Sequence, residues 1–243
     1  MSDLIGGLRR IGLRAPTDVL EALLTHAHKS RQSPAEFVEY LVTVELRERD
    51  ATNLARRNRL ATLGSFKPLD GFDWAHPEKI DRDHYEDLLD LGFMRTGENI
   101  LLRGSSGVGK TTLAQNLALR ALEKGHTVRF CTLATAMADL LRQESLPAVE
   151  RRLKKYTTPD LLVLDEIGYL PCDSRSADLL YNIISRRHEK KSTIVTTNLP
   201  FKQWNTIFPG AACVVALVDR FSQHCHVIDV DACLLYTSDA ADE

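Results

Sequence analysis

The sequence lacks the features that would direct the chain to a membrane or an export route. It has no run of eighteen apolar residues, which is about the length a helix needs to cross a bilayer. Its first residues, Met1 to Leu4, contain no basic segment followed by an apolar stretch, so we expect no signal peptide. Internal repeats and low-complexity segments are also absent. These absences predict a cytoplasmic protein with no membrane partner.

The cysteines follow no pattern of pairing. The five of them are widely spaced and form no CxxC pair. Because their number is odd, at least one could not join a disulfide within the chain. One lies in His224-Cys225-His226, but adjacent residues on a strand point to opposite faces and no second cluster of ligands accompanies them. We therefore expect ordinary core and surface roles for these residues, not a metal site.

The composition is that of a globular protein, with 44% hydrophobic and 26% charged residues. A length of 243 residues suits one domain of ordinary size with a smaller one beside it. Residues 1–65 read as a small helical N-terminal domain, in which Ser33-Pro34-Ala35-Glu36 is a capping box at the start of a one-faced helix. Residues 66–98 read as a linker and the start of a second, larger domain, which we expect to occupy 99–232.

The last eleven residues, 233–243, resemble a translated sequencing-adapter sequence. We expect this tail to be foreign to the protein and exclude it from the prediction of the fold. Its three acidic residues are among 33 in the chain, so 30 remain against 31 basic ones and the formal net charge moves from −2 to +1. On this interpretation the natural protein is truncated near Ala232.

From Asn99 onward, strands and helices alternate. Short apolar runs at 99–103 and 161–164, with further strands at 126–133 and 193–196, are separated by helical stretches at 111–124, 134–142, 147–156 and 176–190. Fully apolar strands of this kind are typical of a parallel sheet that is covered on both faces. The fold class predicted is therefore α/β, a parallel sheet with flanking helices, preceded by the small helical domain.

The loop between the first strand and the first helix of this region has the G-x-x-x-x-G-K-[ST] pattern of a phosphate-binding loop. Glycines allow backbone N–H groups to approach phosphates, and the helix that follows points its positive end at the same anion. Lys110 would contact the β- and γ-phosphates of ATP, and the Thr111 hydroxyl would bind Mg²⁺. The candidate nucleotide-binding residues are Gly104, Ser105, Ser106, Gly107, Val108, Gly109, Lys110, Thr111 and Thr112.

Two acids follow the apolar strand 161–164, at the edge of the sheet where α/β proteins bind ligands. Asp165 would hold Mg²⁺ through water, and Glu166 would act as general base for the attacking water. Asn198 follows the next strand, where its amide could contact both the γ-phosphate and that water. As the first residue of Asn198-Leu199-Pro200 it could equally well begin a turn, and the residues alone leave both interpretations open.

Five segments together resemble the IstB-like helper ATPases of bacterial insertion sequences, relatives of the DnaC-like helicase loaders within the AAA+ class. They are FDW at 72–74, the phosphate-binding loop, LLVLDEIGYLP at 161–171, TIVTTNLPFKQW at 193–204 and LVDRFSQHCHVI at 217–228. The resemblance extends from about Leu8 to Ala232. The loop reads GSSGVGK where the family more often has GPPGTGK, and residues 113–115 also vary. The family's closing segment is replaced by the tail.

The resemblance implies an AAA+ P-loop fold, a sensor role for Asn198 and a role for Arg220 as an arginine finger. Such a residue completes the site of a neighbouring subunit, so hydrolysis would require a homo-oligomer. Without the resemblance, Arg220 would be taken as a surface residue paired with Asp219. The implied activity is ATP hydrolysis by a DNA-transposition helper that assembles on DNA and recruits or activates a transposase.

Two other functions fit the same residues: a DnaC-like helicase loader in replication, and an ATP-dependent binding switch with little turnover. Two basic stretches, Arg47 to Arg59 and Arg151 to Lys155, are candidate contacts to DNA phosphates. A solvated helix face explains each of them equally well.

Overall fold

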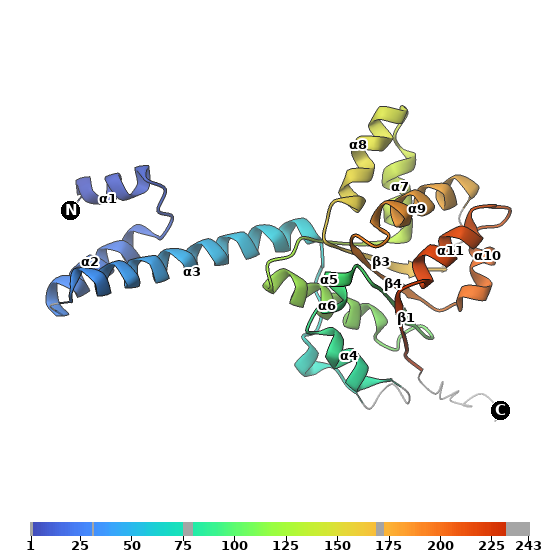
Figure 1. Cartoon of the computed structure of the whole chain (residues 1–243), viewed down its shortest axis with the longest axis horizontal. Coiled ribbons are helices and arrows are strands. Elements are labelled where there is room, and N and C mark those ends of the chain that lie inside the picture. Colours follow the sequence, from blue (N-terminus) through green and yellow to red (C-terminus); the bar gives the residue numbers. More distant parts are fainter. Residues whose placement is uncertain (1, 31, 75–79, 169–172, 232–243) are drawn as a thin grey trace, which may run out of the picture. The chain divides into compact units, whose positions relative to one another are not determined.

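The computed structural model describes residues 2–30, 32–74, 80–168 and 173–231. The chain divides into two compact units, Met1–Arg59 and Leu60–Glu243, whereas the sequence predicted a boundary near residue 65 (Figure 1). The adapter-like tail at 233–243 and the residues 169–171 of the DEIGYLP segment lie outside the described residues. None of the helices described is long and apolar enough to cross a membrane.

The first unit consists of helices, as the sequence predicted: α1 (Ser2–Arg10), α2 (Thr17–Ser30) and most of α3 (Pro34–Ala61). The capping box at the start of α3 is confirmed, because Glu36 accepts a hydrogen bond from the Ser33 backbone at 2.8 Å and the Ser33 hydroxyl accepts one from the Glu36 backbone at 3.3 Å. Further along α3, the buried Glu45 binds the side chain of Arg49. Its carboxylate also accepts the backbone N–H of Ala15 at 3.0 Å, so this acid joins α3 to the segment before α2.

The second unit is built on a five-stranded sheet whose strand pairs are all parallel, in the order β2-β3-β4-β1-β5. Its strands are β1 (Asn99–Arg103), β2 (Val128–Thr132), β3 (Leu161–Ile167), β4 (Ser192–Thr197) and β5 (Cys225–Asp229). The larger helices between them are α6 (Lys110–Glu123), α7 (Leu133–Leu141), α8 (Leu146–Thr157), α9 (Ser174–Arg187) and α11 (Val214–Ser222). The predicted alternation is confirmed, with most bounds shifted by one to three residues.

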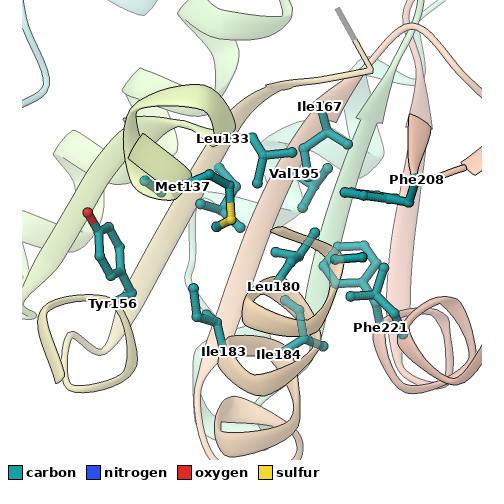
Figure 2. Packing of buried hydrophobic residues seen from close by; sticks show 14 of the residues in the cluster. Leu133, Met137, Tyr156, Ile167, Leu180, Ile183, Ile184, Val195, Phe208 and Phe221 are labelled. Carbon is teal, nitrogen blue, oxygen red and sulfur yellow. The ribbon is translucent and has the colours of Figure 1, made fainter. Parts of the chain in front are cut away.

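A large buried cluster joins the sheet to α7, α8, α9 and α11. Figure 2 shows Met137 and Leu180 directed toward Val195 of the central strand β4, with Phe221 of α11 beside them. Helix α6 packs against β1 to β4 and adds its own buried leucines, including Leu113. Sheet and helices thus form the covered parallel sheet that the apolar strands predicted, and its rigid strands hold the loops at their carboxyl ends.

A buried arginine joins the starts of β3 and β4. Arg187, at the end of α9, is 1% exposed and donates hydrogen bonds to the carbonyls of Pro159 at 2.7 Å, Asp160 at 3.2 Å and Ser192 at 2.5 Å. Burial lowers its pKa to about 9, and the carboxylate of Asp160 acts in the opposite direction. Strand β3, which carries Asp165 and Glu166, and strand β4, which precedes Asn198, are therefore fixed at the ends remote from those residues.

Two short helices in the stretch expected to be a linker were missed. They are α4 (Arg82–Leu88) and α5 (Phe93–Thr96), and the 3-10 turn η1 (Leu69–Gly71) precedes them. Asp81 caps α4 by accepting the backbone N–H of His84 at 2.9 Å. The hydroxyl of the buried Tyr85 then donates to the Leu113 carbonyl of α6 at 3.0 Å. The segment before β1 is therefore packed against the helix that follows the phosphate-binding loop.

Candidate nucleotide-binding site

The phosphate-binding loop connects β1 to α6, as predicted. Gly107 and Gly109 have φ values of 82° and 93°, in the left-handed region that favours glycine. Gly104 is required for another reason: a Cβ there would lie 1.9 Å from the Val230 carbonyl oxygen. From the sequence, all three glycines were expected to serve the approach of phosphates. The structure shows that Gly104 also allows the chain beyond β5 to pass the base of the loop.

An aromatic side chain lies against the last glycine of the loop. A Cβ on Gly109 would lie 2.6 Å from the Phe72 ring. Phe72 stacks edge-on with Trp74 at a centroid distance of 4.9 Å, and Trp74 packs in the same way on Tyr85. The FDW segment quoted for the family resemblance is thus part of the support of the loop.

Lys110 is held inside the loop. Its side chain is buried, and its ammonium donates a hydrogen bond to the Ser105 carbonyl at 2.5 Å. Burial lowers the pKa of Lys110, and the carboxylate of Asp165 acts in the opposite direction. A phosphate group placed in the loop would supply the anionic partner that a buried ammonium favours.

Thr111 and Asp165 meet beneath the loop. The Thr111 hydroxyl lies 3.1 Å from each carboxylate oxygen of Asp165, and Asp165 is 4% exposed at the end of β3. A hydroxyl and a carboxylate are hard oxygen donors of the kind that Mg²⁺ prefers. These two residues therefore fit the metal that the sequence predicted.

Glu166 is exposed, unlike the buried acid beside it. It lines a pocket of about 380 Å³ together with Lys110, Thr111 and loop residues Ser106, Gly107, Gly109 and Thr112, with Thr196 at its base. Its φ of 62° is left-handed, which is uncommon for a residue with a side chain. The pairing of β3 with β4 shifts between Leu164 and Ile167, so Glu166 lies in a β-bulge.

Asn198 and Arg220 lie outside this pocket. Asn198 is exposed after β4 and lines an adjoining hollow of about 490 Å³ with Ser105, Ser106 and Asp231. Ser106 lines both spaces, so the two adjoin, and a Cβ on Gly168 would lie 3.2 Å from the Asn198 amide oxygen. Arg220 is on α11, lines neither space, and stacks over the ring of Tyr181 on α9. Among the described residues it has no ion pair with Asp219.

Thr196 is a site residue that was not expected from the sequence. It is 1% exposed, lines the pocket, and hydrogen-bonds to both Asp165 and Glu166. The signal for it is the polar run Thr196-Thr197-Asn198 at the end of an apolar strand. Placing it beside the acidic pair requires the pairing of β3 with β4, which the sequence does not show.

Comparisons with known proteins identify the family. A family model described as IstB-like ATP binding protein matches residues 7–234. The ATP-binding protein of insertion sequence IS232 from Bacillus thuringiensis subsp. berliner is 36% identical over 197 residues, which are 80% of this chain and 79% of that protein. The ATP-binding protein of insertion sequence IS21 from Pseudomonas aeruginosa is 34% identical, over 87% of this chain and 80% of its own.

Solved structures share the fold. The DnaC helicase loader matches with a TM-score of 0.54 and 20% identity. The match covers 70% of this chain and 96% of the loader chain. AMPPCP-bound DnaA from Aquifex aeolicus matches with a TM-score of 0.57 and 20% identity, over 70% of this chain and 51% of its own. At such identities the likeness concerns the fold alone, which is the AAA+ P-loop fold predicted from the sequence.

Proposed function

We propose that this chain, which belongs to the family of IstB-like ATP binding proteins, hydrolyses ATP as a cytoplasmic helper of DNA transposition. The main support for hydrolysis is the exposed carboxylate of Glu166, which lies in the same pocket as Lys110 and Thr111. A site that only bound ATP would need the loop, the lysine and the threonine. A carboxylate free to accept a proton from water adds what hydrolysis needs.

Each residue then has a defined task. The backbone N–H groups of residues 104–112 and the ammonium of Lys110 would bind the phosphates of ATP. Thr111 and Asp165 would hold Mg²⁺, which neutralises charge on the phosphate oxygens when it is bound. Glu166 would accept the proton of the attacking water, and Asn198 would orient that water.

We assign Arg220 to the site of a neighbouring subunit. Arg220 is half-buried and lines neither space beside its own phosphate-binding loop. No ion pair occupies its guanidinium among the described residues, whereas Arg103, Arg152 and Arg186 are paired with acids. An unpaired guanidinium can donate two hydrogen bonds to phosphate oxygens. The assembly we propose is therefore a homo-oligomer joined through Arg220.

The DNA contacts proposed for 151–155 divide into two groups. Asp139 of α7 binds both Arg152 and Lys155, the latter at 2.9 Å, and these two cations serve the fold. Arg151 and Lys154 are exposed and form no ion pair in the described part of the chain, so they are the stronger candidates for binding DNA phosphates. In the first unit Arg49 is likewise bound to Glu45, which leaves Arg47, Arg56, Arg57 and Arg59.

We favour a transposase as the protein partner over a replicative helicase. The relatives at 36% and 34% identity carry the names of insertion-sequence proteins, whereas the helicase loader is 20% identical. The helicase-loader function and the binding switch with little turnover remain the alternatives, and the switch differs from our proposal in predicting no dependence of turnover on Glu166.

The test is ATP binding and steady-state hydrolysis in the full chain and three variants. Glu166→Gln should bind ATP with unchanged affinity and lose about 10²- to 10⁴-fold in turnover, the usual contribution of a general base. Lys110→Ala should lose affinity for ATP. Lys124→Ala, at the exposed end of the same helix, is the control. Unchanged hydrolysis in Glu166→Gln would remove Glu166 from the reaction and favour the binding switch.

A further inference from the structure

The hydroxyl of Thr196 contacts both members of the acidic pair. It donates a hydrogen bond to a carboxylate oxygen of Asp165 and accepts the backbone N–H of Glu166 at 2.9 Å. A hydroxyl carries one hydrogen, which is donated to the carboxylate, and one of its two lone pairs accepts the amide N–H. Thr196 is 1% exposed, and water has little access to replace either bond.

The pairing of the two strands explains why one hydroxyl reaches both acids. Leu164 pairs with Val195 and Ile167 pairs with Thr197, so Asp165 and Glu166 together face the single residue Thr196. In a regular strand the two acids would point to opposite faces. Here the extra residue of the bulge turns the Glu166 amide toward the threonine side chain.

The backbone of Glu166 needs such a partner. Its φ of 62° is a conformation that a residue with a Cβ keeps only where its surroundings fix it. The amide bond to Thr196 is a direct restraint on that conformation. If the restraint were lost, the backbone could relax and the carboxylate would leave its place in the pocket.

We infer that Thr196 is a positioning residue, whose hydroxyl holds the Asp165 carboxylate and the Glu166 backbone in fixed relation to each other. The inference rests on the proposed function, because its consequence for turnover requires that the chain hydrolyses ATP. A purely structural role is the competing explanation, since a buried threonine can be retained for stability alone. A positioning role predicts that loss of the hydroxyl lowers turnover while ATP binding and folding are retained. A purely structural role predicts no such separate loss of turnover.

The experiment compares two substitutions at Thr196 with a matched control on the same strand. Thr196→Val keeps the shape and removes the hydroxyl, and Thr196→Ser keeps the hydroxyl. The control is Thr193→Val: Thr193 is also 1% exposed on β4, but its hydroxyl accepts from Arg187 at 3.0 Å, remote from the acids. The variants are measured for turnover, for the Kd of ATP as a function of Mg²⁺ concentration, and for Tm.

We expect Thr196→Val to lose about 10²-fold in turnover, the effect of misplacing a reacting group by about 1 Å. It should also require more Mg²⁺ to reach full ATP affinity, because the Asp165 carboxylate is no longer oriented. Thr196→Ser should stay within roughly threefold of the unmodified chain, as expected for a retained hydroxyl. Thr193→Val should change Tm only. Equal turnover in Thr196→Val and Thr193→Val, or a loss in Thr196→Ser as large as in Thr196→Val, would overturn the inference.

A measurement that needs no turnover separates this inference from the proposed function. Hydrogen exchange of the Glu166 amide, followed by NMR, should be slow in the unmodified chain and faster in Thr196→Val. A fast-exchanging Glu166 amide in the unmodified chain would overturn the inference even if Thr196→Val failed to fold. Slow exchange together with absent hydrolysis would instead contradict the proposed function alone.

Discussion

The guanidinium of Arg220 lies over the ring of Tyr181, with its central carbon 5.0 Å from the ring centre. The two residues come from α11 and α9, which pack against each other, and Tyr181 is partly buried against the cluster that joins these helices to the sheet. A ring face attracts a cation without using its N–H groups. Tyr181 therefore orients Arg220 and leaves its hydrogen-bond donors available.

We predict that mixing two inactive variants restores ATPase activity. Arg220→Ala should lose about 10³-fold or more in turnover, as arginine fingers do, and still bind ATP. Lys110→Ala lacks a working loop and retains Arg220. If Arg220 acts in the neighbouring subunit, assemblies of both variants contain complete sites. Activity of the mixture that equals the sum of the separate variants would contradict an action between subunits.

Substitution of Tyr181 should separate orientation of Arg220 from its charge. Tyr181→Leu keeps an apolar side chain and removes the ring face, so turnover should fall by about two- to fivefold, which corresponds to 0.5–1 kcal/mol for an exposed cation–π contact. Tyr181→Phe, the control, should retain turnover. ATP affinity should be equal in both. A comparable loss in Tyr181→Phe would indicate that the phenol hydroxyl, not the ring, is what matters.

Of the basic residues on α8, we predict that Arg151 and Lys154 contribute to DNA binding, whereas Arg152 and Lys155 serve the fold. Removing Arg151 and Lys154 together should weaken binding for all sequences. It should also reduce the slope of log affinity against log salt by about 2, roughly one for each phosphate that is no longer neutralised. Lys124→Ala controls for the loss of an exposed positive charge elsewhere. An unchanged slope in the double variant would exclude α8 from the DNA-binding surface.

Asp139 should make the stability of the second unit depend on acid pH. Partial burial alone would raise its pKa, but hydrogen bonds from Arg152, Tyr156 and Lys155 outweigh this and hold the pKa of Asp139 well below its usual range. Because the folded pKa is lowered, the stabilisation is complete above the unfolded value near 3.9 and is lost as the pH falls through the folded value.

Asp139→Ala should therefore lower the free energy of unfolding at pH 7 by about 1–3 kcal/mol, because the buried Tyr156 hydroxyl loses its acceptor. The difference from the unmodified chain should shrink as the pH is lowered from 5 toward 2, as measured by urea unfolding. A difference that stays constant over this range would contradict the assigned partners.

The sequence predicted the parts of the site that are local in the chain. The strand, glycine loop and helix around Lys110 follow from consecutive residues, and so does the position of Asp165 and Glu166 at a strand end. Contacts that depend on pairing between distant segments could not be predicted from the sequence. Thr196 lies 30 residues along the chain from Glu166 and 31 from Asp165, and only the fold brings its hydroxyl to both.

Two further features show the same limit. The cations at 151–155 looked equivalent in sequence, and the acid that selects two of them is Asp139 on another helix. Short helices are also hard to recognise where apolar residues are sparse: α4 and α5 have seven and four residues, too few for a periodic pattern to appear.

The left-handed backbone of Glu166 lowers the stability of the folded chain at the position of the general base that we propose. Asparagine adopts this conformation more readily than glutamate, because its short polar side chain can hydrogen-bond to the local backbone. A Glu166→Asn chain should therefore melt at a higher temperature than the unmodified chain, and it would lack the general base that we propose. If Glu166 acts as we propose, this strained bulge is a position where the fold gives up stability for chemistry.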